Sequence, residues 1–283
     1  MKKILVPCDF SKPAINAFRF ALDVASQSNG VVHLLHVIEL PVLHDSVLMP
    51  VLDFEQELLK ELKEKAEAEF ENITIKYKIE NVKVVTKVVF GVVSTMILDY
   101  VTNKSINIVI MGSHGASGVR EVFVGSNAEK IVRRSPVPVL TTKEYYKGPV
   151  KNIVLPNNLD TGGQGDFMSK VKVLQNFFKA QLNIVWINTP EQFTPDTITL
   201  ERLKAFAKQY KLTNYSTHVF NSMNEERGIL EFFKLIDGDL IAMATHGYRG
   251  VAHFLNGSMA ENVVNHGDRL IWTYSLRNEP VEA

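Results

Sequence analysis

The sequence lacks what several classes of protein require. It has one cysteine, Cys8, in 283 residues, so no disulfide can form within the chain and no cysteine-based zinc site can be built. Basic and acidic residues both number 31, so the formal net charge is zero. Because nucleic acids are bound by clustered lysine and arginine, this balance argues against a nucleic-acid partner. The single cysteine is typical of a reducing compartment.

Long hydrophobic runs are also missing. The apolar run before Pro7 is shorter than a signal peptide needs, and no stretch approaches the roughly 18 apolar residues of a membrane span. Hydrophobic residues still make up 46% of the chain and charged residues 22%, which is enough apolar surface for a folded core. We therefore expect a soluble cytoplasmic protein with no membrane partner.

The chain does contain a regular alternation of strand and helix patterns. Ser11, with Pro13 behind it, and Ser94 are predicted to cap two of the helices. The expected strands cover residues 4–6, 31–38, 82–90, 106–111 and 137–142, and the expected helices cover 14–25, 54–70, 94–101 and a segment from 126. Such alternation predicts an α/β fold with parallel strands and right-handed helical crossovers.

The same pattern starts again after a linker at residues 145–149. Residues 3–7 recur at 152–156, 33–37 at 183–187, 108–115 at 240–247, and 125–129 at 257–261. Four matched segments in one order indicate a tandem duplication. With a length that suits about two domains, we expect domains at residues 1–144 and 150–283.

A candidate binding site follows the fourth expected strand. The segment 112–115 (GSHG) comes directly after Met111, and after nine further residues Gly125 and Ser126 open a helix. Glycines let a ligand approach the backbone, and a helix N-terminus offers free N–H groups and partial positive charge, so a phosphate chain fits here. The alternative is structural: Ser126-x-x-Glu129 is also a capping box, and glycines after strands shape turns. Neither a Walker A nor a GxGxxG motif occurs.

This spacing resembles the universal stress proteins, whose nucleotide-binding members carry G-x2-G-x9-G-[ST]. Gly112, Gly115, Gly125 and Ser126 fit the pattern at every position, and the opening strand near Asp9, the LLHVI strand and the SPVPVL strand extend the resemblance. It implies two tandem doubly wound, Rossmann-like, five-stranded parallel sheets in strand order 3-2-1-4-5. It also implies that the last strands pair within the chain to form a pseudo-dimer. Whether two chains then form a homodimer is left open.

The resemblance further implies an ATP site in the first copy, with Mg²⁺ as a candidate companion ion. Asp9 would hydrogen-bond at the adenine and ribose end, and Val37 would act there by packing and by main-chain contact, while the phosphates would be lined mostly by backbone N–H groups. A turn role for Asp9 and plain core packing for Val37 stay open as alternatives. The implied nucleotide-binding set is Pro7, Cys8, Asp9, Val37, Met111, Gly112, His114, Gly115, Gly125, Ser126 and Asn127.

The second copy departs from this pattern. Ala244 stands where the first copy has Gly112, and Asn158 stands where it has Asp9. The segment 161–166 is glycine-rich and is either a flexible insertion or a loop able to wrap a pyrophosphate. The candidate second site comprises Asn158, Ile187, Gly247, Gly257 and Ser258.

No residue set points to a catalytic mechanism. We find no Ser-His-Asp order, no paired acidic motif and no metal-ligand cluster, so we expect no catalytic residue and no bound metal of the protein's own. Cys8 is expected to be a buried, inert thiol rather than a reactive one, and His36 to be buried and hydrogen-bonded. The expected function is ATP binding by a stress-response regulatory module. A slow ATP hydrolase using the same pocket, or a nucleotide-independent scaffold, are the alternatives.

Overall fold

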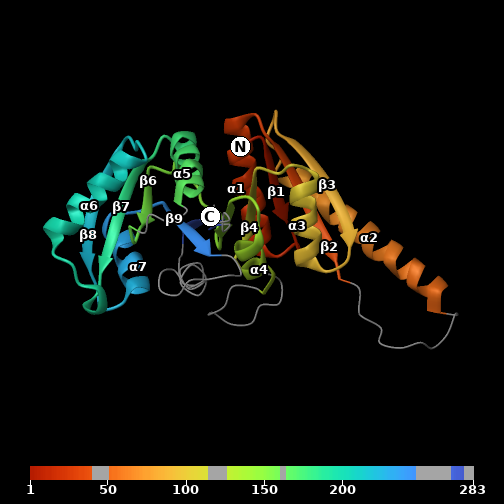
Figure 1. Cartoon of the computed structure of the whole chain (residues 1–283). Helices are drawn as coiled ribbons and strands as arrows, with labels where there is room; N and C mark the ends of the chain where they lie inside the picture. Colours follow the sequence, from red (N-terminus) through yellow and green to blue (C-terminus); the bar gives the residue numbers. More distant parts are fainter. Residues whose placement is uncertain (40–50, 114–125, 160–163, 247–268, 277–283) are drawn as a thin grey trace, which may run out of the picture.

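The first half of the chain alternates strand and helix as the sequence predicts (Figure 1). A computed structural model describes residues 1–39, 51–113, 126–159, 164–246 and 269–276. The elements of this half are β1 (Lys3–Pro7), α1 (Lys12–Ser28), β2 (Val31–Ile38), α2 (Val51–Lys76), β3 (Lys83–Phe90), α3 (Val93–Asn103), β4 (Ile108–Gly112), α4 (Ser126–Arg134) and β5 (Val139–Thr142).

The described part of the second half follows this order up to its fourth strand, with a shorter connection between its second and third strands; residues 247–268, before its last strand, lie outside the described residues. Its elements are β6 (Asn152–Pro156), α5 (Gln164–Phe178), β7 (Gln181–Asn188), a 3₁₀ turn (Pro190–Gln192), α6 (Asp196–Gln209), β8 (Tyr215–Asn221), α7 (Glu225–Leu235), β9 (Leu240–His246) and β10 (Leu270–Leu276).

Helix ends follow the local signals in one predicted case and not in another. Ser11 caps α1 as expected, because its hydroxyl accepts a hydrogen bond from the Ala14 amide at 3.4 Å. The prediction that Ser94 caps the next helix is wrong. Helix α3 begins one residue earlier, with Val92 as the N-cap and the Met96 amide donating to the Val92 carbonyl at 3.0 Å. Ser94 therefore lies inside the first turn, where its hydroxyl cannot take the capping position.

All ten strands belong to one sheet in the order β3-β2-β1-β4-β5-β10-β9-β6-β7-β8. Each half has the expected order 3-2-1-4-5, and its strands are parallel. The halves join where β5 and β10 pair in antiparallel fashion, with Leu140 opposite Trp272. The predicted pairing of the last strands within the chain is therefore confirmed. Association of two chains stays a prediction.

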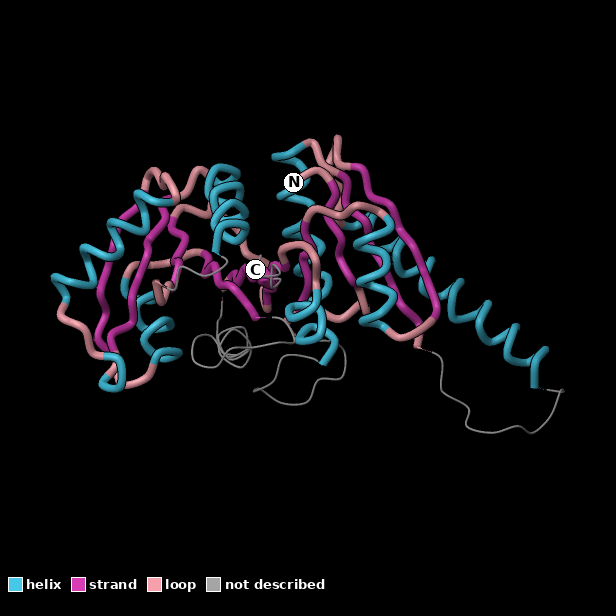
Figure 2. Tube along the Cα trace, viewed as in Figure 1, coloured by secondary structure: helices cyan, strands magenta, loops and turns pink. Residues whose placement is uncertain are grey.

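Helices cover both faces of this sheet (Figure 2). Alternate side chains of β1 divide between two apolar clusters: Ile4 and Val6 pack with α1 and α2, and Leu5 packs with α3 and α4. The second half repeats the arrangement, with α5 and α6 on one face and α7 on the other. Burial on both faces explains why the central strands are continuous apolar runs.

Threonine and serine hydroxyls line the seam between the halves. The Thr141 hydroxyl donates to the Ile271 carbonyl at 3.4 Å, and the Thr273 hydroxyl donates to the Val139 carbonyl at 3.3 Å. The Ser275 hydroxyl reaches across to the Arg133 carbonyl at 3.0 Å. These bonds satisfy polar groups that the seam buries. Within the described ranges, no helix has both the length and the apolar character needed to cross a membrane.

Candidate functional site

The carboxyl ends of three neighbouring strands bring together the residues predicted for the adenine and ribose end of the site, which is called the base side below. Strand β1 lies between β2 and β4, with Leu5 opposite Val109, so Pro7 and Met111 each follow two residues further along. Val37 lies near the end of β2, on the other side of β1. The connection after β1 runs to β2 on one side, and the connection after β4 runs to β5 on the other. A doubly wound sheet opens a crevice for ligands at such a point.

Asp9 forms the turn that leads from β1 into α1. Its Oδ1 accepts hydrogen bonds from the Ser11 amide at 3.1 Å and from the Ser11 hydroxyl at 2.5 Å. The same Ser11 hydroxyl accepts from the Ala14 amide, so Asp9 holds the helix cap in place. The alternative that Asp9 is a turn residue is therefore observed. Asp9 is also exposed, just past the carboxyl end of β1.

Cys8 forms hydrogen bonds through its backbone, and its thiol is buried. Its side chain is 4% exposed, so the expected burial is confirmed, and this burial raises the pKa of the thiol to about 12. The Cys8 amide donates to the Leu35 carbonyl at 2.8 Å. His36 Nδ1 lies 2.7 Å from the Cys8 carbonyl and must carry a proton there, because a carbonyl oxygen can only accept. His36 is hydrogen-bonded as expected, although its ring is half-buried rather than fully buried.

Packing against α1 requires a glycine at position 112, which the sequence pattern does not reveal. A Cβ on Gly112 would lie 2.8 Å from the carbonyl carbon and Cβ of Pro13, and 3.0 Å from the Ala14 nitrogen. The first turn of α1 therefore rests directly on the backbone at the end of β4. After Gly112, the Ser113 amide still donates to the Thr142 carbonyl at 3.1 Å, which keeps this strand end in the sheet. Met111, just before it, is buried.

The phosphate side of the predicted site begins at the N-terminus of α4. Ser126 is the first residue of this helix and is exposed, and Asn127 is half-buried. Glu129 of the alternative capping box forms an ion pair with Arg133, at 3.4 Å. The other predicted phosphate-side residues, His114, Gly115 and Gly125, lie outside the described residues.

The corresponding strand ends of the second half hold a buried residue where the first half has Val37. Ile187 is 7% exposed and Asn158 is half-buried, and a cavity of about 10 Å³ lies beside them. Gly247, Gly257 and Ser258 of the candidate second site lie outside the described residues. The lining of this small cavity is Pro156, Asn157, Asn158, Val185, Trp186, Ile187 and Glu225.

The glycine-rich segment of the second half is only partly a loop. Residues 160–163 lie outside the described residues, but Gln164, Gly165 and Asp166 form the first turn of α5. The expectation that the loop extends to Asp166 is therefore wrong. The Asn157 side chain donates to Gln164 Oε1 at 2.9 Å, and the Tyr274 hydroxyl donates to the Asp166 carboxylate. These two side-chain contacts hold the start of the helix in place, and no sequence pattern predicted them.

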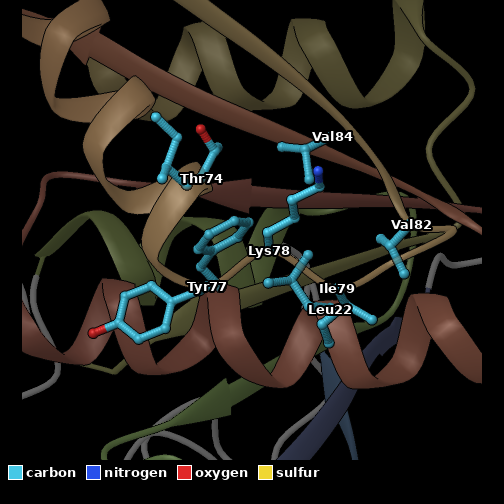
Figure 3. A pocket seen from close by; sticks show the side chains of 9 residues that line it. Leu22, Thr74, Tyr77, Lys78, Ile79, Val82 and Val84 are labelled. Atoms are coloured by element: carbon cyan, nitrogen blue, oxygen red, sulfur yellow. The ribbon is translucent and has the colours of Figure 1, made fainter.

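A larger hollow of about 240 Å³ lies at the opposite edge of the first half (Figure 3). Leu22 of α1 faces the turn between α2 and β3, where Tyr77 and Ile79 form further walls. Because β3 begins at Lys83, this hollow lies at the amino ends of the strands, away from the predicted nucleotide site. Among the described residues, no group of three or more His, Cys, Asp or Glu side chains is placed to hold a metal ion.

The sheet order and the position of the motif can be compared with known proteins. The sequence model of the universal stress protein family matches residues 1–143, which is half of the chain. The chain belongs to the universal stress protein family. Universal stress protein MJ0577 of Methanocaldococcus jannaschii is 31% identical over 153 residues, covering 50% of this chain and 94% of the relative. Universal stress protein YxiE of Bacillus subtilis is 26% identical over 145 residues, covering 50% of this chain and 98% of the relative.

A solved structure resembles the whole of this universal stress protein rather than half of it. The universal stress protein from Archaeoglobus fulgidus covers 97% of this chain, and 98% of that chain is covered in turn, with a TM-score of 0.73 and 19% identity. At that identity the likeness concerns the fold. The predicted family and the predicted architecture are thus both confirmed, and the bound nucleotide stays a prediction.

Proposed function

We propose that this universal stress protein binds ATP in its first half and acts as a regulatory module of the stress response in the cytoplasm. The supporting observation is the meeting of three strand ends at the point where the sheet connections reverse. The carboxyl ends of these strands carry Pro7 to Asp9, Val37, and Met111 with Gly112. We take residues 1–144 and 150–283 as the two domains, with the site in the first.

The chemistry of the base side suits an adenine nucleoside. Val37 is half-buried and uncharged, so it offers an apolar surface to a flat base. Asp9 is exposed and close in sequence to the end of β1, and a carboxylate accepts hydrogen bonds from ribose hydroxyls or an amino group. This side of the site therefore provides both packing and hydrogen bonding.

The phosphate side is supported by the start of α4. The exposed Ser126 opens that helix, and the N-terminus of a helix attracts anions through free N–H groups and its dipole. The third glycine of the motif directly precedes Ser126. Mg²⁺ is proposed only as the companion of the phosphates, whose oxygens are its usual ligands.

A pair of matched variants tests this proposal. Val37→Phe places a larger side chain where adenine would pack, and Val89→Phe makes the same change at the residue opposite Val37 on β3. Both positions are half-buried and share one face of the sheet, so both variants carry a similar folding cost. We expect calorimetric titration with ATP and Mg²⁺ to show binding by the wild type. The affinity for ATP should fall about tenfold or more, roughly 1.4 kcal/mol, in Val37→Phe and not in Val89→Phe.

The same samples separate the alternatives. Equal affinity of the two variants for ATP would refute the assignment of Val37 to the adenine end of the site. ADP formation that disappears in Val37→Phe would favour the slow hydrolase, and the absence of any heat or thermal shift with the wild type would favour the scaffold.

A further inference from the structure

The described strands form a sheet that ends in two unequal edge strands, β3 and β8 (Figure 1). Strand β3 carries Lys83 and Lys87, which are both exposed. Strand β8, with the sequence YSTHVFN, has no Asp, Glu, Lys, Arg or Pro. Charged side chains on an edge strand, lysine above all, discourage other chains from pairing with it. One edge of the sheet therefore has this protection and the other lacks it.

The hydrogen bonds to β7 determine which backbone groups of β8 point outward. At one end the Leu182 amide donates to the Asn214 carbonyl at 3.0 Å, and at the other the Ser222 amide donates to the Asn188 carbonyl at 3.0 Å. Because successive residues of a strand turn their N–H and C=O groups to opposite sides, the even-numbered residues of β8 face β7. The backbone groups of residues 215, 217, 219 and 221 therefore point away from the sheet, where no described strand pairs with them.

The seam between the two halves shows how this chain uses an uncharged edge strand. Strands β5 and β10 lie at the edges of their own halves, and they pair with each other in antiparallel fashion. Their sequences, VLTT and LIWTYSL, lack charged residues and contain hydroxyl side chains. Strand β8 has the same character, with a tyrosine, a serine and a threonine among its seven residues. By composition β8 therefore belongs with the two strands that pair, and β3 does not.

We propose that β8 pairs in antiparallel fashion with β8 of a second copy of the chain, so that two ten-stranded sheets join into one. A two-fold axis presents the same strand from both copies, so one surface serves as both partners. Because β8 carries no charged side chain, no like charges come to lie opposite each other across this contact. This pairing is independent of nucleotide binding and goes beyond the proposed function.

Full overlap of the two strands sets the register. A two-fold axis at His218, the middle residue of β8, places residue 217 opposite residue 219 of the other copy, and 215 opposite 221. These residues have the outward backbone groups, so they form the hydrogen-bonded pairs of the new ladder. His218 then lies opposite its own copy in a pair without hydrogen bonds. A shift of two residues in either direction would leave outward groups at the strand ends unpaired.

Apolar side chains beside the edge add to the contact. Tyr215 begins β8 and Ile198 lies in the first turn of α6, and both are exposed. Val219 packs into the apolar cluster that α6 covers, and Tyr215 shares its face of the strand because side chains alternate. Since α6 begins at the carboxyl ends of the strands, antiparallel pairing brings Tyr215 of one copy to the same end of the contact as Ile198 of the other.

Sedimentation velocity of the full-length chain tests the pairing. The chain has a mass of 31.9 kDa, and we expect the wild type to form a species of twice that mass as its concentration rises. Thr217→Pro removes an outward N–H group and leaves the bonds to β7 in place, and Thr217→Lys adds a charge to the edge. Each should weaken association about tenfold or more, a loss of roughly 1.4 kcal/mol. A wild type that stays monomeric at its highest soluble concentration would overturn the proposal.

Thr86 provides the matched control on the other edge strand. The Gly91 amide donates to the Ile38 carbonyl at 3.0 Å, so the odd-numbered residues of β3 face β2 and the Thr86 backbone points outward. Thr86→Pro and Thr86→Lys should therefore leave the dimer intact. Thermal melting checks that each variant is folded, and Thr217→Lys carries the test if Thr217→Pro is not. A dimer that persists in the folded Thr217 variants, or that the Thr86 variants weaken equally, would overturn the proposal.

Cross-linking tests the register. In a pair without hydrogen bonds the two Cα atoms lie about 4.5 Å apart, which is within the range of about 4.4–6.8 Å that a disulfide spans. Because Cys8 is buried, a cysteine introduced at position 218 is the thiol accessible to an oxidant such as copper phenanthroline. We expect oxidised His218→Cys to become a disulfide-linked dimer and oxidised Thr86→Cys to stay uncross-linked. A dimeric His218→Cys sample that forms no disulfide would overturn the pairing centred on this residue.

Discussion

Gly112 and Pro13 lie in direct contact where the end of β4 meets the start of α1. A Cβ on Gly112 would be 2.8 Å from the Pro13 Cβ, closer than two carbon atoms can approach without a shift. The contact joins the strand that carries the glycine motif to the helix that Ser11 caps, with Asp9 bonded to that cap residue. The first glycine of the motif is therefore required by packing within the chain.

Gly112→Ala is expected to destabilise the protein before it affects any ligand. The added methyl group must push α1 away from β4, and overpacking of this kind costs about 1–3 kcal/mol. The free energy of unfolding from urea titration should fall by that amount. Gly165→Ala is the control, because nothing lies within 4 Å of a Cβ there. Its effect should be neutral or slightly stabilising, by less than about 1 kcal/mol, and equal losses in the two variants would contradict the contact.

Cys8 is expected to resist thiol reagents until the chain unfolds. The thiol is 4% exposed and its pKa is raised to about 12 by burial, so little thiolate is present or accessible at pH 8. Because the chain has one cysteine, mass spectrometry after iodoacetamide treatment reads this site alone. The labelling rate should rise with urea along the unfolding curve, and fast labelling without urea would contradict the burial.

The same thiol should make stability fall at alkaline pH. The unfolded thiol ionises near its ordinary pKa of 9.0, whereas the folded thiol stays protonated up to about 12. Its contribution is therefore complete below pH 9 and is lost as the pH rises from 9 towards 12. The stability difference between the wild type and Cys8→Ala should shrink over this interval, and a pH-independent difference would contradict the assignment.

Tyr146 is expected to stabilise the junction between the two halves. Asp239 accepts a hydrogen bond from the Tyr146 hydroxyl at 2.5 Å and from the Lys151 and Asn152 amides at 2.8 Å. Tyr146→Phe removes one of these donors, and because the groups are half-buried we expect a loss of about 1 kcal/mol in unfolding free energy. Tyr215→Phe, at an exposed tyrosine, is the control and should change stability less.

The contribution of Tyr146 should also depend on pH. Burial, followed by the hydrogen bond to Asp239, raises the pKa of Tyr146 above its ordinary value of 10.0. The stabilisation is then present below pH 10 and is lost as the pH rises through the raised pKa. Urea titrations of the wild type and Tyr146→Phe at pH 8 and above pH 10 check this, and a difference that grows at high pH would contradict it.

Much of the fold could be predicted because local patterns repeat. Apolar runs such as 31–38 locate buried strands, and the order of four matched segments indicates two copies. The cap at Ser11 follows from a hydroxyl just before a helical pattern, and the structure confirms it. The cap predicted at Ser94 fails because the helix begins at Val93, which no capping signal marks.

The site could be predicted only in part. The residues at the ends of β1, β2 and β4 meet as the strand order requires, so their convergence follows from topology. The contact of Gly112 with α1, and the contact of Gly228 with Ile187, join segments far apart in the chain and depend on how closely a helix approaches a strand. Such distances are not encoded in any local pattern.

The sequence by itself determined the α/β class, the two copies, and the spacing of the glycine motif. Each of these depends on periodicity or repetition along the chain. Only the tertiary structure decided that Val37 is half-buried while its counterpart Ile187 is buried against α7. The physical reason is that the exposure of a side chain depends on packing between elements that lie far apart in the chain, as where the α7 backbone at Gly228 contacts Ile187.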